Sequence, residues 1–69
     1  MQEQQQMHQQ QAQAHRDAGK ALQMAAEHCE RAAQAFERGD AHEAQRLAQE
    51  SEVHSKEASQ AMQRAKQQA

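Results

Sequence analysis

At the middle of the chain stands the stretch Phe36-Glu37-Arg38-Gly39-Asp40-Ala41-His42-Glu43-Ala44. Gly39 lies where a helix would end, because glycine readily adopts the left-handed conformation that closes a helix C-terminus. Asp40 follows as a candidate N-cap, and Glu43 stands three residues later, as in a capping box. Two helices joined by so short a turn must run antiparallel. We therefore predict a helix over about 12–38, a turn at 39–40 and a helix over about 41–67.

Small residues return at every seventh position on both sides of this turn. They form one line along each predicted helix, which we label position a of a heptad. The stripe consists of Ala18, Ala25 and Ala32 before the turn, and of Ala44, Ser51, Ala58 and Ala65 after it. Position d, on the same side of each helix, holds mostly alanines, and its other residues are His28, Leu47 and His54. The pattern predicts an all-α fold, an antiparallel two-helix hairpin whose seam is rich in alanine.

One edge of this hairpin is charged. At heptad position g the sequence offers three couples of opposite sign, and the two residue numbers of each couple have the same sum. The couples are Arg38 with Glu43, Arg31 with Glu50, and Asp17 with Arg64. Exposed ion pairs contribute little free energy, so we use them to predict the register of the two helices. Arg38 is also expected in the last turn of the first helix, where a cation favours the negative end of the helix dipole.

The opposite edge, at positions e and b, is apolar. We call it the apolar edge, and it consists of Leu22, Ala26, Cys29, Ala33, Phe36 and Met62. Nothing in the predicted hairpin covers this edge. A single core in a chain below about 70–80 residues rarely supplies more than roughly 3–5 kcal/mol, and one cysteine cannot form an internal disulfide. We therefore expect self-association through the apolar edge into a homodimer or homotetramer, completing a four-helix bundle.

Two residues on helix one allow more than one interpretation. Cys29 is read first as a small buried thiol, because no basic partner shares its face. It could instead meet its symmetry mate near a dimer axis and form a cross-link. Gly19 indicates either a close helix–helix approach or a weak point in the helix, where glycine costs about 1 kcal/mol relative to alanine.

A possible metal site lies near the seam. His28 and His54 both fall at position d, about one helical turn apart in the predicted register, with Glu50 and Glu57 on the same side. Two imidazoles and two carboxylates could hold Zn, Ni or Cu between helices. The sequence favours the competing interpretation, in which these histidines occupy a half-buried seam and hydrogen-bond to nearby glutamates. Otherwise no cofactor is expected.

Composition excludes several classes of function. The net charge is −2 with acids and bases mixed along the chain, and no basic stripe for nucleic acid is present. No apolar run approaches the ~20 residues that span a bilayer, and the start of the chain lacks the features of a secretory signal. Residues 1–11 are rich in glutamine and are expected to form a frayed helical overhang or to be disordered. We expect a cytoplasmic protein without a membrane partner.

The stretch 36–44, followed by Ala48, His54, Ala58, Ala61 and Ala65, resembles a group of small bacterial Ala/His-rich helical-hairpin proteins of unassigned function. In that group a Gly-Asp turn joins helices with repeated histidine and alanine. The architecture is also similar to the Rop-type hairpin dimer that modulates RNA, although the sequence is not.

These observations predict a homo-oligomeric helical bundle that acts as a structural or protein-interaction module. No nucleophile, base and orienting group stand together, so catalysis is not expected. The first alternative is a protein that binds or buffers transition metals through interhelical histidine and glutamate. The second is a Rop-like RNA-binding bundle, against which the acidic balance argues.

Overall fold

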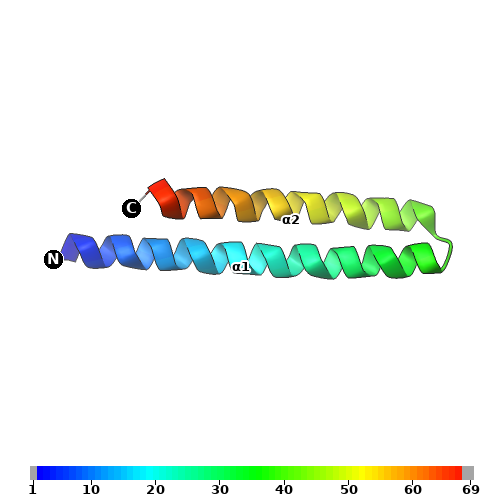
Figure 1. The fold of residues 1–69 in the computed structure, drawn as a ribbon, viewed down its shortest axis with the longest axis horizontal. Coiled ribbons are helices and arrows are strands. Elements are labelled where there is room, and N and C mark those ends of the chain that lie inside the picture. The colour runs from blue at the N-terminus through cyan, green and yellow to red at the C-terminus, as the bar shows by residue number, and fades with distance from the viewer. Residues whose placement is uncertain (1, 68–69) are drawn as a thin grey trace.

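The computed structural model of the chain describes the backbone of residues 2–67 and the side chains of residues 6–66. Helix α1 spans Gln2–Glu37 and helix α2 spans Ala41–Gln67. The two run antiparallel along their length, and α1 extends beyond the end of α2 (Figure 1). The glutamine-rich residues 2–11 therefore form the first turns of α1. Residue 1 of the predicted overhang and residues 68–69 at the end of the chain lie outside the described residues. The predicted all-α antiparallel hairpin is confirmed.

The turn is built as the sequence indicates. Gly39 has a φ of 80°, in the left-handed region that glycine tolerates. The backbone N–H groups of the two turn residues close the end of α1. The Gly39 N–H donates to the Phe36 carbonyl at 3.0 Å, and the Asp40 N–H donates to the Ala35 carbonyl at 2.8 Å. The Asp40 carboxylate then accepts a hydrogen bond from the Glu43 N–H at 3.1 Å, which caps α2.

Two details of this turn differ from the prediction. Arg38 lies just beyond α1, which ends at Glu37 and has no basic residue in its last turn. The capping box is only half formed, because the Glu43 side chain binds Arg46 instead of returning to the Asp40 N–H. That N–H is already used to close the end of α1, so the reciprocal bond has no free donor.

The seam consists of the predicted small residues. All seven predicted position-a residues are buried, and so are the alanines at position d, namely Ala14, Ala21, Ala35 and Ala61. Leu47, with 6 % of its surface exposed, is the only large aliphatic side chain among the buried residues that the structure describes. It packs with three alanines near the turn, and these four residues form the buried core cluster: Ala32, Ala35, Ala44 and Leu47. The Ala-rich seam is therefore confirmed, and it is thin.

The hairpin is long and narrow for its chain length. Its Cα atoms extend over 57 × 14 × 10 Å, and their radius of gyration is 16.1 Å. A compact domain of this length has a radius of gyration of about 11 Å. A single layer of two helices has no further element to cover the faces that point away from the seam, so those faces stay exposed.

Candidate functional site

The apolar edge is exposed along the hairpin. Leu22 and Phe36 on α1 expose 49 % and 56 % of their surfaces, and Met62 on α2 exposes 39 %. Between them Ala26, Cys29 and Ala33 are exposed as well. Each lies at position e or b, so the side that the heptad assignment left uncovered is uncovered in the structure. The largest apolar side chains of this edge are thus outside the core, whereas the core is made of alanine.

An open groove continues this edge toward the free ends of the two helices. It has a volume of about 410 Å³ and is lined by Gln11, His15, Met62, Ala65 and Lys66. His15 and Met62 are both at position e, on opposite helices. Their common groove places the position-e stripes of α1 and α2 on the same side of the hairpin.

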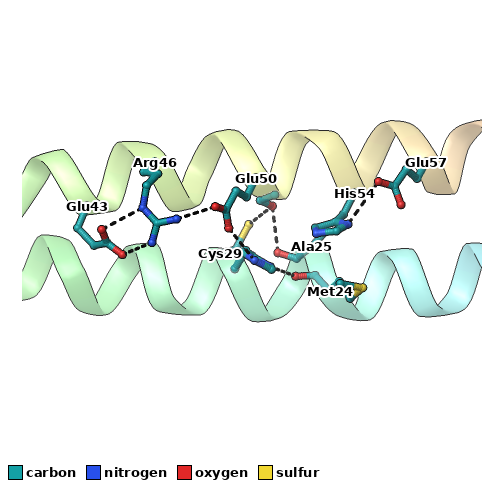
Figure 2. Close-up of polar contacts among 10 residues, drawn as sticks. Met24, Ala25, Cys29, Glu43, Arg46, Glu50, His54 and Glu57 are labelled. Atoms are coloured by element: carbon teal, nitrogen blue, oxygen red, sulfur yellow. Dashed lines mark hydrogen bonds and ion pairs between the residues drawn. The ribbon is translucent and has the colours of Figure 1, made fainter.

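Cys29 sits in the middle of the apolar edge. Its Sγ atom lies 3.0 Å from the Ser51 hydroxyl, which in turn donates to the Ala25 carbonyl at 3.0 Å (Figure 2). Cys29 is exposed in the single chain, so the interpretation as a buried thiol is wrong for the isolated hairpin. A Cβ added to Gly19 would meet no atom within 4 Å, and the hairpin itself therefore provides no close approach at that glycine.

A polar cluster lies on the opposite side of the seam. The two His28 ring nitrogens face oxygen acceptors, the Met24 carbonyl at 2.7 Å from Nδ1 and a Glu50 carboxylate oxygen at 2.9 Å from Nε2 (Figure 2). A carbonyl and a carboxylate can only accept, so a ring with both nitrogens protonated satisfies this arrangement. The His28 ring thus contacts both the backbone of its own helix α1 and a side chain of α2.

His54 is the second histidine of the cluster, and the centroid of its ring lies 5.0 Å from that of His28. Its Nδ1 atom is buried without a hydrogen-bond partner and lies 3.7 Å from a Glu57 carboxylate oxygen. The four predicted ligands thus lie along one seam, but each glutamate approaches its own histidine. Among residues 6–66 no group of three or more histidine, cysteine or acidic side chains is arranged to hold a metal ion.

The charged edge uses different partners from those predicted. Arg46 binds Glu43 one turn before it and Glu50 one turn after it, the latter at 2.6 Å. Of the predicted couples only Asp17 with Arg64 is present, at 3.7 Å. The couples Arg38–Glu43 and Arg31–Glu50 are absent among the described side chains, because Arg46 takes both glutamates and His28 shares the second.

Arg46 has an electrostatic effect on the first of these glutamates. Its hydrogen bond holds the pKa of the Glu43 carboxyl below its ordinary value, and the pKa of Arg46 is raised in return. The sequence signal for this network was the spacing Glu43-x-x-Arg46-x-x-x-Glu50, which places both acids beside the arginine on one helix. These side chains are solvated, and they hold one another in place on the α2 surface near the turn.

Comparison with protein-family models, with curated proteins and with solved structures finds no match to this chain. The resemblance to Ala/His-rich hairpins therefore stands as a likeness of architecture, without a family. The structure adds that neither α1 nor α2, over the residues described, combines the length and the apolar character needed to cross a membrane. Any function must be argued from the two edges of the hairpin.

Proposed function

We propose that the protein is a structural and protein-interaction module whose active form is a homo-oligomeric helical bundle, assembled through the apolar edge. One observation carries the proposal. The hairpin buries alanines in its seam and leaves Leu22, Phe36 and Met62 outside, on a single edge. A fold that used its best hydrophobic side chains for its own stability would place them in the core.

The exposed area is consistent with a missing partner. The chain exposes 5415 Å², whereas a compact monomer of this mass exposes about 4,400 Å² by the scaling of area with mass. The excess of about 1,000 Å² is close to the ~800 Å² that each partner buries in a standard protein interface. A second copy is the occupant that we propose, because it brings the same unsatisfied edge and gives a closed symmetric assembly.

Sedimentation velocity on the native chain tests this proposal. We expect a homodimer or homotetramer at micromolar concentration, and a change of Leu22 to glutamate should dissociate it by placing a charge in an apolar contact. A stable monomer at these concentrations would overturn the proposal.

A matched control separates loss of the interface from loss of the fold. Val53 on α2 is exposed to 55 %, similar to Leu22, but lies at position c on the outer face of the hairpin. Val53→Glu should therefore leave the assembly intact. If both variants dissociate while circular dichroism shows unchanged helix content, the contact surface is not confined to the apolar edge and the assignment to that edge is wrong.

A further inference from the structure

We infer that the second copy docks antiparallel, with α1 against its own copy and a two-fold axis close to Cys29. This inference rests on the proposed self-association and specifies its geometry. The α1 part of the apolar edge carries a large apolar residue at the same distance on each side of Cys29. Leu22 lies seven residues before it and Phe36 seven residues after it, and an alanine lies between on each side, Ala26 three residues before and Ala33 four residues after. A two-fold interface requires this kind of self-complementarity.

Helix α2 is centred at the same height. Its position-e residues are Ala41, Ala48, Ser55 and Met62, which are all exposed. The midpoint of this stripe falls beside Ser51, and the Ser51 hydroxyl is the group that Cys29 Sγ contacts at 3.0 Å. The segment from Leu22 to Phe36 on α1 and the segment from Ala41 to Met62 on α2 are therefore centred at one level of the hairpin, and a single two-fold axis there serves both.

The pairs generated by this axis fit in size. The axis generates two equivalent contacts, each between Leu22 of one copy and Phe36 of the other. The alanines that lie between Leu22 and Phe36 let the two α1 backbones approach closely. On α2 the long Met62 side chain meets the partner's Ala41, and Ala48 meets the partner's Ser55. Cys29 meets the partner's Cys29. On α2 the one large side chain thus faces an alanine that leaves room for it, and on α1 the small residues between Leu22 and Phe36 leave room for those two side chains.

The competing arrangement sets α1 against the partner's α2. Position b of α2 carries polar residues, so the α1 alanines would then pack on Gln45, Glu52 and Ser59. When α1 packs on the partner's α1, its alanines avoid these polar residues. The most apolar surface of one copy then contacts the same surface of the other copy. The cost of this packing is that Glu52 lies near the partner's Glu52 at the rim, where exposed like charges repel weakly. Glu52→Gln should therefore tighten the dimer at low salt, and it should have no such effect in the competing arrangement.

Disulfide trapping with the full-length chain tests the geometry. Diamide, which accepts the two electrons and two protons released by a thiol pair, should link native dimers through Cys29. Two single-cysteine chains are then made on a Cys29→Ser background, one with Leu22→Cys and the other with Phe36→Cys. Neither should link to itself, whereas an equilibrated mixture of the two should give a disulfide dimer in high yield. The same mixture in urea, where contacts are random, gives the reference yield.

The outcomes separate the two proposals. A wild-type chain that sediments as a monomer overturns the proposed function, and this geometry with it. A dimer in which the Leu22→Cys chain links to itself shows a parallel arrangement. A dimer that gives no link in the mixture above the urea reference shows α1 packed on the partner's α2. Either of the last two results overturns the antiparallel inference and leaves the self-association standing.

Discussion

The two leucines of this chain should respond differently to truncation, because they occupy opposite roles in the fold. Leu47 lies in the seam with 6 % of its surface exposed, and Leu22 lies on the apolar edge with 49 % exposed. Leucine and alanine have similar helix propensities, so Leu→Ala at either site tests packing more than helix formation. The pair is therefore an internal control for the seam and for the edge.

The expected costs follow from burial. Truncating a buried leucine costs about 2–5 kcal/mol, and a seam only one side chain deep can close partly on the gap. We therefore expect about 2–3 kcal/mol for Leu47→Ala, which is a large share of the roughly 3–5 kcal/mol that a single core of this size supplies. Leu22 is half covered in the isolated hairpin, so Leu22→Ala should cost about 1 kcal/mol there. In the dimer its exposed half is covered too, and the cost should about double.

Urea unfolding followed by circular dichroism, at low and at high protein concentration, measures both effects. The free-energy cost of Leu47→Ala should not depend on concentration, whereas that of Leu22→Ala should increase with it, because only dimer formation covers the second half of that side chain. A Leu47→Ala change of less than about 0.5 kcal/mol would refute the view that this leucine anchors the seam. A Leu22→Ala cost that stays constant with concentration would refute burial of Leu22 in an assembly.

Further predictions concern the turn and the polar groups. Asp40→Ala should lower the free energy of unfolding by about 1 kcal/mol through loss of the α2 cap, and Gly39→Ala should lower it by about 1–2 kcal/mol through the left-handed φ; both are measured by urea unfolding. Arg46→Gln should raise the pKa of Glu43 toward its ordinary value, followed by NMR of its carboxyl carbon. Since the folded pKa is the lower one, this ion pair stabilises the hairpin above the carboxyl's unfolded value of about 4.3 and is lost as pH falls through the folded value. Added Zn²⁺ should not raise the melting temperature, because both His28 ring nitrogens face oxygen acceptors.

The fold could be predicted from the sequence because its signals are redundant. Seven small residues at heptad spacing give the seam, and Gly39 followed by Asp40 gives the turn. Each signal alone is common in helices, but only an antiparallel hairpin satisfies both. The uncovered position of Leu22 and Phe36 follows from the same assignment. Burial along the seam depends on backbone geometry, which the heptad pattern fixes.

The polar partners could not be predicted in the same way. Exposed ion pairs differ little in energy, so long side chains select among several partners by local distance. Arg46 lies within one turn of Glu43 and Glu50 on its own helix, and this proximity outweighed the cross-helix partners. The heptad pattern predicts the position of His28 at the seam, but its acceptor on its own helix is a backbone carbonyl. Sequence carries no signal for a particular carbonyl, since every residue has one.

The alanine seam would link the stability of this chain to the proposed assembly. Alanines let two helix backbones approach closely, but each removes little apolar surface from water, so the free energy gained within one hairpin is small. Three of the larger hydrophobic side chains, Leu22, Phe36 and Met62, lie on the edge that only another molecule can cover. Whatever binds that edge must also stabilise the hairpin, because binding to the folded state shifts the folding equilibrium. The melting temperature should therefore rise with protein concentration, and a melting temperature independent of concentration would show that the hairpin is stable without a partner.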